Sequence, residues 1–344
     1  MRKLHAHPVR VTLAAFGLAG AAVVGIAGAY GFGVFAQAWS NLDFAWLALA
    51  VGAELLAVPA YMLCYRALAR VNNGPRLQPP LVARVVMGGF GPFAVRGGFV
   101  LDKRALHAIE GDEETASVRV LGLGALEWAL LAPVACVSAI ALLATGDPRP
   151  MASLLWPWAI AVPVGFALGL WLAAPARLDR IADGDARWRH GLDIALRAVA
   201  TLRLLARSSC WAAWIGMAAY WAFDIASFYG ALRFIGLHLN LGEVILAYAT
   251  GYALTRRSMP LGGAGITEAL MTLALHWVGQ PVPLALAAVV VYRVFNFVLP
   301  TIPALVVRDR VKPLLEAADE GRTPAHKEHS RAAAPLGWLS GPPG

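Results

Sequence analysis

The chain has 344 residues, of which 59% are hydrophobic and only 15% are charged, and its formal net charge at pH 7 is +8. Soluble globular domains carry roughly a quarter charged residues, so these proportions exclude a water-soluble fold of this size. Basic residues gather in a few connecting segments, which indicates membrane topology and argues against a nucleic-acid partner. The sequence therefore predicts an all-α, polytopic membrane helix bundle that occupies residues 1–312.

Six apolar segments reach or approach the roughly 20 residues that an α-helix needs to cross about 30 Å of hydrocarbon. They are Val11–Phe35, Phe44–Tyr65, Val118–Ala144, Ser153–Ala174, Cys210–Ile235 and Leu284–Val307. The first follows a basic start, as in a secretory signal peptide, but signal peptides usually have a shorter apolar core. We therefore expect six full spans, beginning with an uncleaved first helix.

Two further apolar segments, Val85–Val100 and Val244–Val278, are interrupted by Gly and Pro. The first lies between connections rich in Arg, and the second lies between connections that contain no Lys or Arg. Because short loops rich in Lys and Arg face the cytoplasm, each broken segment should enter and leave on one side, as a re-entrant helical hairpin. The two halves would then form an inverted repeat, which commonly marks a transporter's binding site.

The same charge pattern predicts a multi-pass protein of the cytoplasmic (inner) membrane, with both termini in the cytoplasm. Residues 313–344 are polar and rich in Pro and Ala. We expect them to form a disordered cytoplasmic tail.

The second broken segment contains the strongest candidate site. Arg256 and Arg257 are costly inside an apolar segment, and Pro260 ends one half-helix. Gly262, Gly263 and Gly265 let the backbone turn, and a second half-helix then begins, followed by Glu268. Arginines beside a helix N-terminus suit a phosphate. The alternative is a structural salt bridge that holds the break together.

Two more arginines are candidates for the same site. Arg96 lies in the first broken segment, where it either contributes to a site or extends to the membrane interface. Arg293 lies inside the sixth span, where an arginine normally faces the bundle or a wet cavity. Its candidate carboxylate partners are Glu54, Glu127 and Asp224. A buried structural ion pair is the alternative role for Arg293.

Catalytic signals are weak. His107 and Asp112 have an HxxxxD spacing known from acyltransferases, which we interpret as a chance match in a polar loop. The sequence has no HExxH, GxSxG or Walker A motif. The cysteines show no metal-ligand spacing. We expect no enzymatic activity, no cofactor and no metal.

A family resemblance rests on the run Pro260-Leu261-Gly262-Gly263-Ala264-Gly265 with Glu268, followed by Tyr292-Arg293 and Pro300. With these motifs the chain resembles the lysylphosphatidylglycerol synthase transmembrane region family over about residues 10–310. The resemblance implies flippase-like movement of aminoacylated phosphatidylglycerol between leaflets. Full-length synthases carry a soluble aminoacyltransferase domain, whereas only a short tail follows here, so synthase activity is not implied. The family's Arg-Gly-Glu in the first break is replaced by Arg96-Gly97-Gly98.

Three functions remain open at this point. The first is a transporter that binds or moves an anionic phospholipid or a lipid-linked headgroup. The second is a non-enzymatic membrane partner of an envelope glycosyltransferase or lipid synthase. The third is an intramembrane enzyme that modifies headgroups, with Glu268 as acid or base. Charged residues at mid-membrane depth favour the first and third functions.

Overall fold

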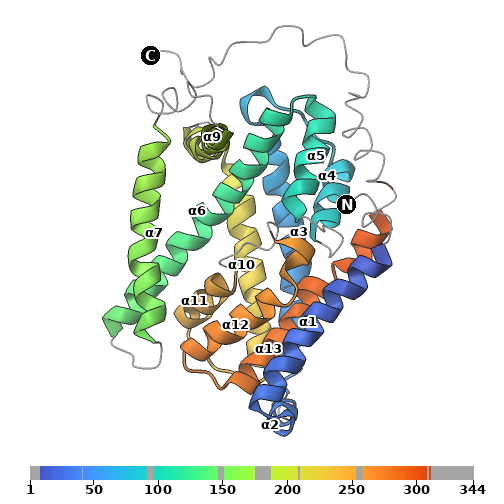
Figure 1. The fold of residues 1–344 in the computed structure, drawn as a ribbon, viewed down its shortest axis with the longest axis vertical. Helices are drawn as coiled ribbons and strands as arrows, with labels where there is room; N and C mark the ends of the chain where they lie inside the picture. Colours follow the sequence, from blue (N-terminus) through green and yellow to red (C-terminus); the bar gives the residue numbers. More distant parts are fainter. Residues whose placement is uncertain are drawn as a thin grey trace.

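The computed structural model describes residues 8–40, 42–90, 97–145, 151–174, 187–207, 210–252, 259–307 and 310. Within these ranges the chain folds as one α-helical bundle, with 3-10 and π-helical turns and no strand (Figure 1). The prediction of an all-α polytopic bundle is confirmed. The expected tail over residues 313–344 lies outside the described residues.

Five helical segments of the described chain are long and apolar enough to cross a membrane. They are α1 (Pro8–Tyr30), α3 (Ala45–Ala69), α6 (Glu113–Thr145), α7 (Ala152–Leu172) and the segment that begins with α13 (Val282–Arg293) and continues to Val307. The predicted first span, Val11–Phe35, is divided. Gly31, with a φ of 94°, separates α1 from the short helix α2 (Phe32–Gln37).

The predicted fifth span corresponds to α10 (Trp211–Phe234), which is not among these five. Its Trp and Tyr residues and Asp224 lower its hydropathy. Even so, α10 lies antiparallel beside α3 from end to end. The Cys210 Sγ is 3.8 Å from the Ala67 carbonyl oxygen at one end, and the Asp43 N–H donates to the Phe234 carbonyl oxygen at 3.0 Å at the other. The helix therefore covers the same distance as a span.

Two glycines of α10 allow this close packing. A Cβ on Gly216 would lie 2.6 Å from the backbone nitrogen of Cys64, and a Cβ on Gly230 would lie 2.8 Å from that of Ala50. Backbone atoms cannot yield as a flexible side chain can. Small residues at such contacts bring membrane helices together, so α3 and α10 form the tightest pair of the bundle's core.

Each broken segment folds as two short helices in contact. The first gives α4 (Pro79–Phe90) and α5 (Gly98–Glu110), and the second gives α11 (Leu241–Gly251) and α12 (Ile266–Trp277). These helices have 12, 13, 11 and 12 residues, so each is roughly 16–20 Å long. None reaches across about 30 Å of hydrocarbon. Re-entrant insertion and the inverted repeat stay predictions.

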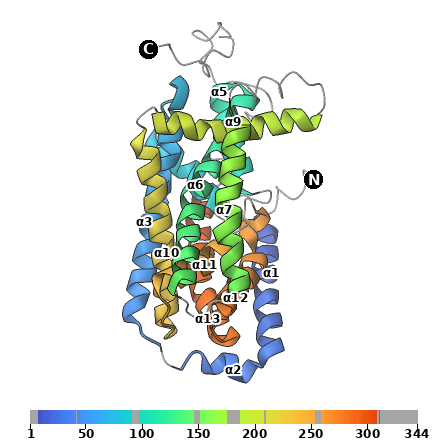
Figure 2. The same ribbon diagram turned by 90° about the vertical axis from the view of Figure 1, so that its left-hand side faces the viewer.

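The connections that are rich in Arg and the connections that lack Lys and Arg lie at opposite ends of the bundle (Figures 1 and 2). At the end where α2 lies, the Met151 N–H donates to the Trp277 carbonyl oxygen at 2.7 Å, which joins the start of α7 to the end of α12. At the other end the basic helix α9 (Arg187–Arg207) lies across the spans, and Arg197 contacts Glu114 at the start of α6. The charge pattern thus separates the two ends correctly.

The junction between α5 and α6 shows what Asp112 does. Its carboxylate accepts the backbone N–H groups of Glu114 and Thr115 at 3.3 and 2.9 Å, and also the Thr115 hydroxyl, as an N-cap does. Partial burial acts to raise the pKa of Asp112, but these hydrogen bonds outweigh it and hold the pKa below its usual value. Asp112 therefore caps the start of α6.

Candidate functional site

The connection between α11 and α12 contains an unusual backbone turn. Pro260–Gly263 form a 3-10 turn, and α12 then begins at Ile266. Leu261, Gly262, Gly263 and Gly265 have φ values of 54°, 64°, 71° and 84°. Glycine adopts such values readily, whereas Leu261 does so at a cost that is typical of functional sites.

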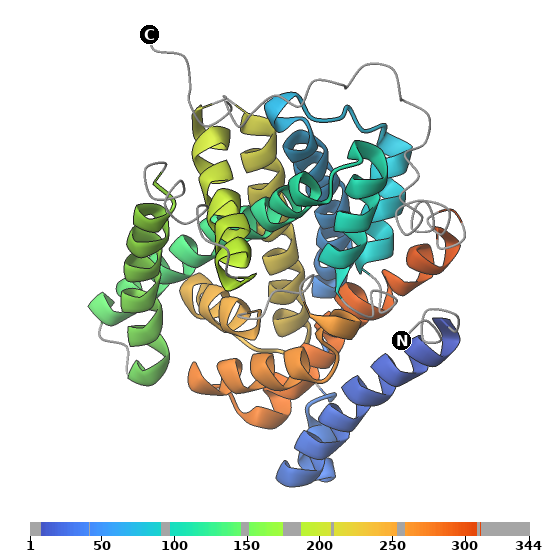
Figure 3. The ribbon, with the colours of Figure 1, turned by 45° about the horizontal axis from the view of Figure 1, so that its top comes forward.

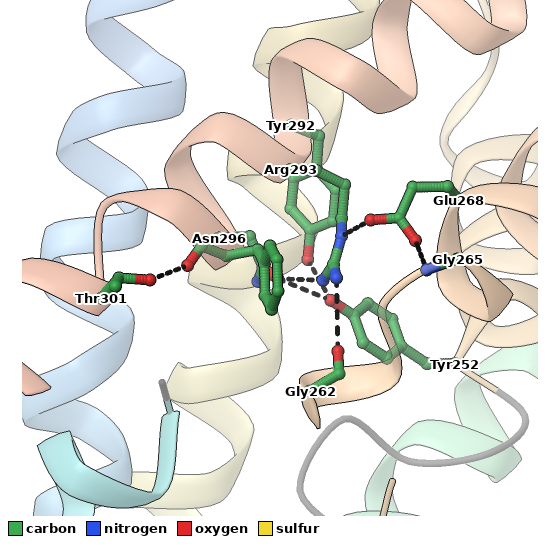
Figure 4. A network of polar contacts seen from close by, with 9 residues as sticks. Tyr252, Gly262, Gly265, Glu268, Tyr292, Arg293, Asn296 and Thr301 are labelled. Atoms are coloured by element: carbon green, nitrogen blue, oxygen red, sulfur yellow. Dashed lines mark hydrogen bonds and ion pairs between the residues drawn. The ribbon is translucent and has the colours of Figure 1, made fainter. Parts of the chain in front are cut away.

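Glu268 and Arg293 meet at this turn (Figure 4). The Arg293 Nε lies 2.7 Å from the Glu268 Oε1, and the two side chains are only 5% and 2% exposed. The other carboxylate oxygen, Oε2, accepts the Gly265 N–H at 2.7 Å. Arg293 also donates from Nη2 to the Gly262 carbonyl oxygen at 3.3 Å. Four of the predicted site residues, Gly262, Gly265, Glu268 and Arg293, are therefore in one polar cluster.

A π-helical turn over Val294–Val298 follows Arg293 directly. π-Helical turns are rare in proteins overall, but those that occur are often at functional sites. Here the turn directly follows Arg293, whose side chain reaches Glu268. The Arg293 Nη1 also donates to the Asn296 Oδ1, within the turn, at 3.3 Å. The guanidinium carbon lies 4.3 Å from the centre of the Phe297 ring. The side chain is thus held on several sides.

A network of buried polar side chains connects Asn296 to Asp224. The Asp224 carboxylate accepts the Tyr248 hydroxyl at 2.6 Å, the Tyr292 hydroxyl at 2.8 Å and the Asn296 Nδ2 at 2.9 Å. Tyr252 joins the same network through its hydroxyl, 2.9 Å from the Asn296 Oδ1. The sequence interpretation missed Tyr248, Tyr252 and Asn296. The spacing of four residues between Tyr248 and Tyr252, and between Tyr292 and Asn296, was the available signal.

The expected carboxylate partners of Arg293 need correction. Its ionic partner is Glu268, and Asn296 lies between Arg293 and Asp224. Glu127 instead accepts the Tyr61 hydroxyl at 3.0 Å. Glu54 is buried on α3. A helix break places Glu268 next to Arg293 although the two lie on different elements, and sequence spacing could not show this.

Three predicted site residues, Arg96, Arg256 and Arg257, lie outside the described residues. Gly263 lies at the turn, where an added Cβ would be 2.5 Å from the Thr267 Oγ1.

Helix α1 covers one side of the turn. Ala15 packs with Ala264 and Phe297 in a small buried cluster, and the Phe16 and Phe297 rings are 5.6 Å apart, edge to face. A Cβ on Gly265 would lie 3.2 Å from the Leu18 carbonyl oxygen of α1. Figures 1 and 3 show α1 and α7 on opposite sides of the bundle.

The donors of this cluster suit an oxyanion, because a guanidinium and a backbone N–H at a helix start both favour negative charge. In the part of the chain that the structure describes, no group of three or more His, Cys, Asp or Glu side chains could hold a metal ion.

The family described as "Lysylphosphatidylglycerol synthase TM region" matches residues 11–304. The chain belongs to this family. No curated protein matches the chain. The family match runs from Val11, in the first turn of α1, past the π-helical turn, and it includes the Arg293 cluster. The protein is thus a multi-pass integral membrane protein of a family associated with lipid metabolism or transport.

Proposed function

We propose that the protein binds the phosphate of an anionic phospholipid inside the membrane and moves that lipid between leaflets, without changing it covalently. The observation that carries the proposal is the position of Arg293. It lies near the middle of the 26-residue span Val282–Val307, buried beside a broken helix. Even the lower values for placing an arginine at mid-membrane are about 2.5–3.5 kcal/mol, so an arginine kept there needs a role.

The broken helix supports the same proposal. Hydrocarbon cannot satisfy free backbone N–H groups, so a break at membrane depth requires protein or water around it. The turn before α12 presents the Gly265 N–H toward Arg293, and Glu268 bridges the two. Two oxygens of a phosphate would accept hydrogen bonds from the same two donors. The family's association with lysylphosphatidylglycerol agrees with an anionic or aminoacylated phospholipid as substrate.

The proposal also includes location. We place the protein in the cytoplasmic membrane with both termini in the cytoplasm, because the basic helix α9 lies at the end opposite α2.

A leaflet-transfer assay tests the proposed function. The purified chain is reconstituted into liposomes that contain fluorescent phosphatidylglycerol in both leaflets, and a reductant added outside bleaches only the outer leaflet. Wild-type protein should allow bleaching of nearly all the lipid, whereas Arg293→Gln should leave the inner leaflet protected. Mass spectrometry of the recovered lipid should show an unchanged headgroup.

Arg119→Gln is the matched control. Arg119 forms an equally short ion pair, with its Nε 2.7 Å from the Glu110 Oε1, at the α5–α6 end of the bundle. Loss of that pair should leave transfer intact. Equal transfer by Arg293→Gln and wild type would refute the proposed function, and a modified headgroup would favour an enzyme instead.

A further inference from the structure

The anion site described above is already filled by a side chain of the protein. The Glu268 carboxylate accepts the Gly265 N–H through Oε2 and the Arg293 Nε–H through Oε1, each at 2.7 Å. Two oxygens of a phosphate diester would engage the same two donors. Glu268 therefore acts as an internal anion, and a phosphate has to displace it or share its donors.

It is electrostatically unfavourable for a phosphate and an ionised Glu268 to share the Arg293 and Gly265 donors. Both side chains are almost fully buried, so an ionised Glu268 and a phosphate would place two negative charges around one guanidinium. At a separation of about 5 Å and an effective dielectric constant of about 20, that repulsion weakens phosphate binding roughly 300-fold. Protonation of Glu268 removes this repulsion and breaks its ion pair with Arg293. Because the phosphate adds one negative charge and the proton adds one positive charge, the net charge of the cluster does not change.

Other charged and titratable groups around Glu268 are few among the described residues. Helix α13 brings Tyr292 and Arg293. Helix α11 brings Tyr248 and ends next to Tyr252. Its single carboxylate, Glu243, caps its first turn with Asn240, away from the site.

Asp224 on α10 is the nearest other carboxylate in the described network, and Asn296 separates it from Arg293. The face of α1 against the turn is apolar, at Ala15 and Phe16, and α12 itself carries only His276, two turns further along. Glu268 is the acid in direct contact with both anion-binding donors.

We propose that Glu268 takes up one proton when a phosphate diester binds to Arg293, so that lipid binding is coupled to proton uptake. This inference rests on the proposed function. In the step, the Arg293–Glu268 ion pair breaks, a proton from water converts the Glu268 carboxylate to the neutral acid, and the phosphate monoanion takes its place on Arg293 and the Gly265 N–H. Release of the lipid reverses the step and returns the proton.

Calorimetry measures the proton directly. The full chain, purified in detergent, is titrated with dihexanoyl-phosphatidylglycerol in buffers of different ionisation enthalpy near neutral pH, which gives the number of protons taken up per bound lipid. Wild-type protein should take up about one proton, and its affinity should rise as pH falls. Glu268→Gln should take up none, and should bind roughly 300-fold more tightly with little dependence on pH.

Two further variants and one further ligand complete the test. Glu110→Gln, which alters the remote, partly buried pair with Arg119, should keep the wild-type proton number. Uptake that persists in Glu268→Gln and disappears in Asp224→Asn would overturn the proposal. Dimethyl phosphate, a diester without acyl chains, shows whether the phosphate alone suffices or the lipid is required; either result, with uptake dependent on Glu268, supports the coupling.

The outcome separates the two proposals. Binding that is lost in Arg293→Gln but involves no proton uptake by the wild type would overturn the coupling and leave the proposed function standing. Binding unaffected by Arg293→Gln would overturn both. The wild-type proton number does not depend on any variant folding, so a value of zero is decisive by itself.

Discussion

Replacing Arg293 and Glu268 separately and together distinguishes a structural ion pair from a functional one. Arg293→Met leaves the Glu268 carboxylate buried, without the partner that lies 2.7 Å away. It also removes the contacts to the Gly262 and Asn296 oxygens, each at 3.3 Å. Breaking one side of a buried pair typically costs about 3–5 kcal/mol. Protonation of Glu268 limits that cost, so we expect a loss near the lower end, at about 3 kcal/mol.

The double variant Arg293→Met with Glu268→Gln leaves no buried charge at this pair, and such replacements are often neutral or stabilising. We therefore expect it to recover most of the lost stability, while the neutral amide still accepts the Gly265 N–H. Thermal unfolding in detergent measures the stability, and the leaflet-transfer assay measures function. A stable double variant that transfers no lipid supports the site. A stable double variant that transfers lipid at the wild-type rate would show that the pair is only structural.

Three further changes test particular parts of the structure. Gly216→Val should separate α3 from α10 and lower the free energy of unfolding by about 1–3 kcal/mol or more, measured by thermal unfolding, whereas Gly169→Ala, with open space around its Cβ, should not. Gly263→Val requires a β-branched residue at a φ of 71°, which costs roughly 1–2 kcal/mol, and leaflet transfer should be lost while the protein still purifies. Asp112→Ala should remove about 1 kcal/mol of cap stabilisation. Because the folded pKa of Asp112 is lowered, that contribution is present above about pH 4 and is lost as pH falls through the folded pKa, so wild type and variant should converge in unfolding temperature at acidic pH.

The apolar pattern of the sequence was sufficient to predict most of the long helices. Segments such as α3 and α7 are long, continuous and apolar, and the bilayer leaves a helix as the structure that satisfies their backbone. The apolar pattern failed to predict helix ends where a single residue changes the local backbone geometry. Gly31 ends α1 within a continuous apolar run, and hydropathy gives no indication of that turn.

The candidate site was predicted in part. Glu268 and Arg293 were both predicted as site residues, and both lie in the site. Their pairing was not predicted, because it depends on how α12 and α13 pack and the two residues are 25 positions apart. Asn296 was missed because a single amide in an apolar helix carries no charge signal; its role follows from the position that the π-helical turn gives it beside Arg293.

Native mass spectrometry of the protein released from anionic lipid nanodiscs tests the central claim most directly, because it counts the lipids that remain bound. Wild-type protein should retain one phosphatidylglycerol more than the Arg293→Met, Glu268→Gln double variant, and the Arg119→Gln control should match the wild type. The same number of retained phosphatidylglycerol molecules in the wild type and the double variant would contradict a phosphate site at Arg293.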